Sequence, residues 1–365
     1  MLLSQGSGEL RRLPPCHFRF CHRPPIPVAS QEAAHLRTGS AVRCGWPWVL
    51  VASIIAAMDT HKLSDTAARA SKAVAHKPPW LKRRALTAET WQQMKQMLDR
   101  LALATICEEA DCPNVGECFR QGTATFLILG RTCTRNCRFC AVRHGRPDPV
   151  DPDEPQHLVE AVQQLGLRHV VITSVTRDDL ADGGAAHFAA CIEALHANTP
   201  ASVEVLIPDF GGREAPLRAV LAAGPEVLGH NVEVVPRLYP LIRPAADYRR
   251  SLRVLERAKR IRPSVYCKSG LMVGVGEREE EVIQVLRDLR DVHCDFVTIG
   301  QYLSPSQLHY PVAEYVEPQT FERYARVAQE LGFSGVSCGP FVRSSYRAAQ
   351  MLDRARGLPG RAHGA

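Results

Sequence analysis

From about residue 124 onward, short apolar segments alternate with longer amphipathic ones. The short segments are rich in Val, Ile and Leu, which is typical of strands buried on both faces. The longer segments have the 3.6-residue period of helices that pack against a core. The predicted strands are residues 124–129, 169–173, 202–207, 226–230, 265–272 and 295–299. The predicted helices are residues 154–165, 185–197, 215–223, 248–261, 279–292 and 318–331.

This alternation predicts an α/β fold, a partial (β/α)6 barrel of the TIM type with parallel strands. Barrels of this kind carry their chemistry at the carboxyl ends of the strands. Upstream, a helix is expected from Thr87 to about Leu103, where apolar residues recur at helical spacing. We therefore expect four regions, with an extension on each side of the barrel: residues 1–58, 59–123, 124–315 and 316–365.

The first 58 residues differ from the rest of the chain and are expected to be disordered. They contain six arginines, no lysine, many prolines and only Glu9 and Glu32 as acidic residues. Their apolar run, residues 48–57, is about half of the roughly 20 residues that a membrane-spanning helix needs. The segment is an Arg-rich organellar transit peptide, a signal peptide or an extension upstream of an initiator at Met58. We favour the third interpretation.

Composition places the chain among globular proteins, since 45% of its residues are hydrophobic and 23% charged. The net charge of +7 is too diffuse to demand a nucleic-acid partner, and the basic residues are not interleaved with aromatics on one face. Residues 77–84 form a basic stretch around Trp80. This stretch is either a docking surface for an acidic partner or a solvated turn.

The thirteen cysteines are too few for a disulfide scaffold, and their number is odd. Their distribution is uneven, because six of them lie between residues 107 and 140. Such crowding favours metal ligation in a reducing compartment over disulfide formation. The six are Cys107, Cys112, Cys118, Cys133, Cys137 and Cys140.

The downstream three, Cys133, Cys137 and Cys140, have C-x3-C-x2-C spacing just after the first predicted strand. Three thiolates on one short loop can bind three irons of a 4Fe–4S cluster and leave the fourth iron open to a small molecule. The alternative is structural zinc, which prefers four closed ligands in two close pairs. The spacing favours the cluster, with these three cysteines as its catalytic ligands.

The upstream three, Cys107, Cys112 and Cys118, have C-x4-C-x5-C spacing. On spacing alone they could bind zinc or a cluster. Their position beside the first motif favours a second, auxiliary 4Fe–4S cluster.

These motifs resemble the radical S-adenosylmethionine superfamily and, within it, the lipoyl synthase family. The resemblance covers roughly residues 77–350, and its combination of motifs is highly specific. The segments that carry it are residues 107–119, 122–130, 172–184, 230–239, 268–274, 300–303 and 343–346.

The resemblance implies a reaction. In that family the open iron binds S-adenosylmethionine, whose reductive cleavage yields a 5′-deoxyadenosyl radical. The radical removes hydrogen from an octanoyl chain held on a lipoyl carrier domain, and two sulfurs are inserted at C6 and C8. The auxiliary cluster supplies the sulfur and is consumed, so both clusters should face one substrate channel. A serine of residues 343–346 is its fourth ligand; we assign Ser345, with Ser344 as the near alternative.

The resemblance also implies contacts with S-adenosylmethionine. The glycine pair Gly183 and Gly184 would let the backbone approach the methionine moiety, or it forms a plain turn. Polar residues at strand ends, and Lys268 within the fifth predicted strand, would line the same site, or they only cap their strands. These polar residues are Thr173, Ser174, Asn231, Glu233, Lys268 and Gln301.

The expected cofactors are two 4Fe–4S clusters and S-adenosylmethionine. The expected partners are octanoylated carrier domains (2-oxoacid dehydrogenase E2 and the glycine cleavage H protein) and a low-potential electron donor. We expect a monomeric sulfurtransferase that binds neither nucleic acid nor membrane, in the bacterial cytoplasm, or in mitochondria if residues 1–58 are a transit peptide. Two alternatives remain: another sulfur-inserting radical enzyme, similar to biotin synthase, and a non-enzymatic electron carrier with two clusters.

Overall fold

The computed structural model describes residues 77–81, 88–109, 112, 114, 118 and 124–358. The chain divides after Met58, and every described residue belongs to the second of the two units, Asp59–Ala365. The predictions for residues 1–58, and those for residues 82–84 of the basic stretch, fall outside the described residues.

Seven parallel strands form the centre of the fold, and a short antiparallel strand, β1 (Ala104–Thr105), borders the first of them. The strand order is β1-β2-β5-β6-β7-β8-β9-β10, so β1 and β10 are the two edges of an open sheet. The parallel strands are β2 (Thr125–Ile128), β5 (His169–Ser174), β6 (Ser202–Leu206), β7 (Val227–Gly229), β8 (Tyr266–Val273), β9 (Phe296–Gln301) and β10 (Gly335–Gly339).

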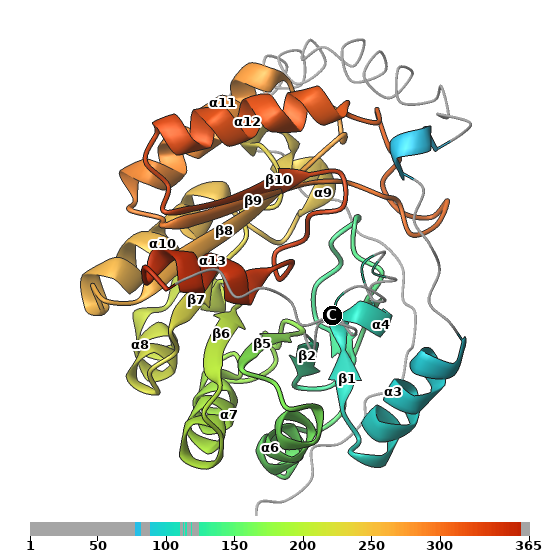
Figure 1. Ribbon diagram of the computed structural model, residues 1–365, viewed down its shortest axis with the longest axis vertical. Helices are drawn as coiled ribbons and strands as arrows, with labels where there is room; N and C mark the ends of the chain where they lie inside the picture. Colours follow the sequence, from blue (N-terminus) through green and yellow to red (C-terminus); the bar gives the residue numbers. More distant parts are fainter. Residues whose placement is uncertain are drawn as a thin grey trace, which may run out of the picture. The chain divides into compact units, whose positions relative to one another are not determined.

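Helices connect successive strands and lie along the outside of the curved sheet (Figure 1). Each presents an apolar stripe to the strands; Leu158 and Val162, for example, are fully buried. Parallel strands require such crossovers, which also bury the outer face of the sheet. The helices are α6 (Glu154–Leu165), α7 (Ala185–Asn198), α8 (Glu214–Ala222), α10 (Tyr248–Ile261), α11 (Glu279–Asp291) and α12 (Pro318–Glu330).

These elements confirm the predicted partial barrel, and all six predicted strands and six predicted helices are present within two residues of their expected ends. The predicted upstream helix is α3 (Ala88–Arg100). The prediction of six strands was incomplete, because β10 follows α12 as a seventh parallel strand. It is half-buried and begins and ends with glycine, so it lacks the apolar run that marked the others.

A C-terminal helix, α13 (Ala348–Ala355), was also not predicted. Its Met351 and Leu352 pack with Val227 and Phe296, which begin β7 and β9. The helix therefore covers the amino ends of these strands, opposite the end where a barrel carries its chemistry. In the described part of the chain, no helix has both the length and the apolar character needed to cross a membrane.

Candidate functional site

A cavity of about 560 Å³ lies at the carboxyl ends of the strands and is lined by both cysteine groups. Residues of β2, β5, β6, β8 and β9 form its walls, and the segment after β10 borders it as well. The predicted site residues on this cavity are Cys107, Cys112, Cys118, Cys133, Cys137, Cys140, Thr173, Ser174, Asn231, Glu233, Gln301, Ser344 and Ser345.

The downstream cysteines lie on a loop that begins in β3 (Thr132–Cys133) and ends before β4 (Arg143–His144). These two short strands pair in parallel and close the base of the loop. The sulfur of Cys133 accepts backbone N–H groups from Arg135 at 3.4 Å and Thr176 at 3.3 Å. Backbone donors of this kind stabilise a sulfur that carries negative charge, as a cluster ligand does.

The donor set of this loop fits an iron–sulfur cluster. Burial raises the pKa of Cys140 to about 12, and burial also raises the pKa of Cys137, against the opposing charge of Arg243. Thiolates form in such surroundings when a metal replaces the proton. Among the described residues, no three His, Cys, Asp or Glu side chains converge closely enough for a single metal ion. A cluster has no such requirement, because each cysteine binds its own iron.

The upstream cysteines form the second group. Cys107 lies on α4 (Ile106–Glu109), and burial, reinforced by the neighbouring Cys112 and Cys118, raises its pKa to about 12. Asn114, between the latter two, donates from Nδ2 to the carbonyl of Phe341 at 2.6 Å. That hydrogen bond joins the cysteine segment to the chain just before Ser344 and Ser345, which line the same cavity.

Two predicted cofactor contacts have a buried polar atom with no hydrogen-bond partner. The two atoms are Ser174 Oγ and Asn231 Oδ1, and both residues line the cavity. The other atoms are already engaged: Thr173 Oγ1 donates to the carbonyl of Leu206 at 3.1 Å, and Asn231 Nδ2 donates to Glu233 Oε1 at 3.0 Å. Burial raises the pKa of Glu233, against the charge of Arg243. Buried polar atoms without partners indicate a ligand, since leaving them unsatisfied is costly.

Three predicted contacts lie elsewhere. Gly183 and Gly184 do not line the cavity; both have positive φ, and a side chain at these positions would collide with Phe210 and Leu129. These features fit the turn, which was the alternative interpretation, and the contact of this pair with the methionine moiety stays a prediction. Lys268 is also absent from the cavity lining, because its ammonium pairs with Glu204 at 2.8 Å in the core. Glu204 itself does line the cavity, and the predicted contacts of the three residues with the cofactor stay predictions.

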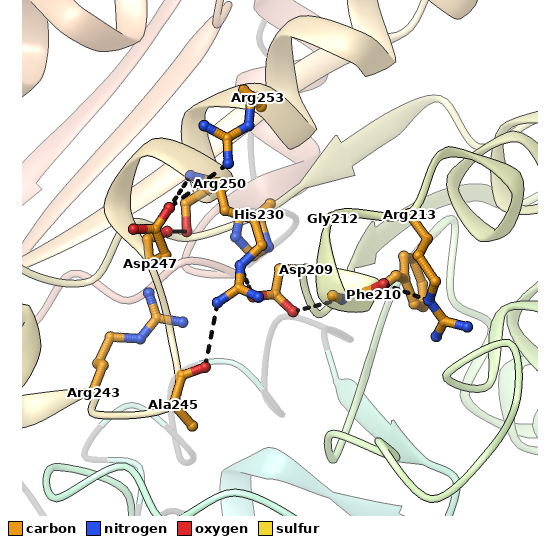
Figure 2. Close-up of polar contacts among 12 residues, drawn as sticks. Asp209, Phe210, Gly212, Arg213, His230, Arg243, Ala245, Asp247, Arg250 and Arg253 are labelled. Carbon is orange, nitrogen blue, oxygen red and sulfur yellow. Dashed lines mark hydrogen bonds and ion pairs between the residues drawn. The ribbon is translucent and has the colours of Figure 1, made fainter.

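Four charged residues on the cavity were not predicted: Arg135, Glu204, Asp209 and Arg243. Asp209 lies just beyond β6, close to His230 and Arg250 (Figure 2). Two of them carried a sequence signal: Arg135 stands between two cluster cysteines, and Asp209 follows a predicted strand at its carboxyl end. Arg243 follows a short helix that was not predicted, α9 (Tyr239–Ile242), so nothing in the sequence pointed to it.

Comparison with known proteins agrees with this geometry. A model of the Radical SAM superfamily matches residues 127–289. Lipoyl synthase of Caldanaerobacter subterraneus subsp. tengcongensis is 56% identical over 281 residues, covering 77% of this chain and 99% of that protein. Lipoyl synthase of Caldicellulosiruptor saccharolyticus is 56% identical over 275 residues, covering 75% of this chain and 96% of that protein.

The barrel, the cysteine loop at the end of its first parallel strand and the matching family model define a radical S-adenosylmethionine protein. More than half of the aligned residues are identical to those of lipoyl synthases over nearly their whole length. The chain belongs to the lipoyl synthase family.

Proposed function

We propose that this chain forms the lipoyl group on a carrier domain, with Cys133, Cys137 and Cys140 holding one 4Fe–4S cluster and Cys107, Cys112, Cys118 and Ser345 holding the other. The enzyme is a radical sulfurtransferase that uses S-adenosylmethionine and two such clusters. The observation that carries the residue assignment is that both groups line one cavity. A substrate carbon there can meet both the source of the radical and the source of sulfur.

When bound, the cofactors would supply the radical that removes hydrogen and the sulfur that is inserted, which no side chain can provide. The chain's own residues bind and orient. Arg243, whose Nε is buried without a hydrogen-bond partner, and Asn231, whose Oδ1 lacks a donor, suit the carboxylate and the amino group of S-adenosylmethionine. Ser174 Oγ, also without a hydrogen-bond partner, adds a third polar group beside Arg243 and Asn231 on the cavity. Apolar residues on the same cavity, such as Leu127, Leu206 and Met272, suit an octanoyl chain and exclude water.

The partners belong to the same proposal. An octanoyl group reaches this cavity on a carrier domain of a 2-oxoacid dehydrogenase or of the glycine cleavage system, and a low-potential donor supplies electrons. Lys77 is exposed and lines the cavity, which supports an approach by an acidic domain from this side. We place the protein in the bacterial cytoplasm as a monomer.

The test is incubation of the reconstituted, reduced protein with S-adenosylmethionine and an octanoylated lysyl peptide. Mass spectrometry should find the peptide with two added sulfurs, and 5′-deoxyadenosine should accumulate. Formation of 5′-deoxyadenosine without sulfur in the peptide would point to another radical enzyme. The electron-carrier alternative predicts neither product.

A further inference from the structure

One buried carboxylate joins two arginines beside the Cys133–Cys140 loop. The side chain of Asp209 is 2% exposed. Its Oδ1 accepts from Arg135 Nη2 at 2.7 Å and from the Gly211 amide at 3.0 Å, and its Oδ2 lies 3.1 Å from Arg250 Nε (Figure 2 shows the Arg250 side). Burial alone would raise the pKa of Asp209, but the hydrogen bond and charge of Arg135 lower it to about 2. The group is therefore a carboxylate at neutral pH.

The first arginine belongs to the cysteine loop itself. Arg135 lies between Cys133 and Cys137, its side chain is only 10% exposed, and its own amide donates to Cys133 Sγ. Its guanidinium also pairs with Asp178, at 2.7 and 2.9 Å. The two carboxylates differ in burial, because Asp178 is 48% exposed. Solvent weakens the exposed ion pair between Arg135 and Asp178. The buried ion pair with Asp209 therefore does more to fix the position of Arg135.

The second arginine contacts the segment that packs against the other side of the loop. Arg250, on α10, donates from Nη2 to the carbonyl of Ala245 at 3.5 Å, and Asp247 caps its amide at 2.6 Å (Figure 2). The segment before Ala245 contacts the cysteine loop directly: the Ile242 carbonyl accepts from the Arg138 amide at 2.9 Å. Arg243 of this segment interacts with Cys137. Through its two arginines, Asp209 thus reaches both sides of the loop.

We propose that Asp209 is a positioning residue for the cluster on Cys133, Cys137 and Cys140. By fixing Arg135 it holds the Arg135 amide on Cys133 Sγ, and by fixing Arg250 it holds the segment against Cys137 and Arg138. This inference rests on the proposed ligand role of the loop. An amide donor to a ligand sulfur stabilises the reduced cluster and raises its potential.

The positioning role and a simple charge effect predict changes of opposite sign in the reduction potential of the cluster. Asp209→Asn removes a negative charge, which by itself would raise the reduction potential. Loss of the amide contact to Cys133 would lower it. The matched control is Asp178→Asn, which removes the same charge from the exposed partner of the same arginine. Asp209→Glu keeps the charge and displaces the carboxylate by one methylene group.

The experiment is an EPR-monitored redox titration of the reconstituted full chain, following the cluster whose signal responds to S-adenosylmethionine. We expect lower potentials and faster iron loss for Asp209→Asn and Asp209→Glu, with little change for Asp178→Asn. A higher potential in Asp209→Asn together with an unchanged one in Asp209→Glu would overturn the inference. If Asp209→Asn does not fold, Asp209→Glu provides the test by itself. An unchanged reduction potential in Asp209→Glu would then reject the positioning role of Asp209.

Cys137→Ala separates this inference from the proposed function. If Cys137→Ala keeps the responsive cluster, the ligand assignment fails, and the inference fails with it. If Cys137→Ala loses that cluster while both Asp209 variants leave its potential and iron retention unchanged, only the role of Asp209 is wrong.

Discussion

The two cysteine groups reach the same cavity by different routes. The downstream group is local: Cys133 to Cys140 form one loop, and neighbouring amides and strand ends hold it in place. The upstream group is spread over residues 107–118 and borders a distant segment of the chain, through the hydrogen bond from Asn114 to Phe341, 227 residues away. A site on one loop depends on local geometry, whereas a site shared between distant segments depends on both being folded.

The two groups also differ in the charged residues that surround their thiols. Cys137 interacts with the guanidinium of Arg243, and Arg135 is anchored beside Cys133. Burial and the thiol of Cys112 raise the pKa of Cys107, a backbone hydrogen bond with Thr125 opposes them, and no arginine of the described part of the chain is among the main influences on this pKa. We infer that the downstream loop is built to keep its cluster. In the proposed assignment the upstream group would combine soft thiolates with the hydroxyl of Ser345, a harder ligand that is easily protonated, which would suit a cluster that is dismantled.

The largest expected effect is that of Cys137→Ala. Losing one of three iron ligands on the loop should abolish 5′-deoxyadenosine formation, measured by chromatography, and lower the iron content from about eight to about four per chain. Cys338→Ala is the control, because Cys338 lies in β10 and does not line the cavity. Full cleavage activity in Cys137→Ala would refute the loop as the radical site.

Cys112→Ala should separate the cleavage of S-adenosylmethionine from sulfur insertion. We expect 5′-deoxyadenosine formation to continue and sulfur insertion into the octanoylated peptide to stop, because only the upstream cluster loses a ligand. The iron content should again be about four per chain. If lipoyl product still formed, the upstream group would not be the sulfur donor.

Ser345→Ala should resemble Cys112→Ala, with a partly occupied or short-lived upstream cluster instead of none. Ser344→Ala is the matched control, since it removes a neighbouring hydroxyl that lines the same cavity. Iron content and cluster lifetime under excess reductant report the difference. If Ser344→Ala lost the upstream cluster while Ser345→Ala retained it, Ser344 would be the fourth ligand in place of Ser345.

The smallest expected effect is that of Asn114→Leu, which removes no ligand. It leaves the Phe341 carbonyl without this donor, at a cost of about 1–3 kcal/mol to the contact between the two segments. The upstream cluster should be lost faster, while 5′-deoxyadenosine formation stays unchanged. Equal losses of both clusters would show that the two groups are not independently supported.

Sequence patterns predicted most of the barrel, because the alternation of buried strands and amphipathic helices reflects the burial of the sheet. They missed β10, whose residues are only half-buried and which glycines flank. They could not show that Lys268, within a predicted strand, has a buried carboxylate partner 64 residues away, at Glu204. Gly183 and Gly184 stay ambiguous for a related reason: a glycine pair needed for packing looks the same in sequence as one needed for a ligand.

Chemistry that depends on short spacing could be predicted directly from the residues. Cys133, Cys137 and Cys140 lie on one short loop, so their spacing alone nearly brings their sulfurs together. Contacts between distant segments could not be predicted, because side-chain partners are chosen by how the elements pack. Folding alone brought Ser345 to the cavity of the upstream cysteines, paired Arg135 with Asp209 and aligned both cysteine groups on one cavity.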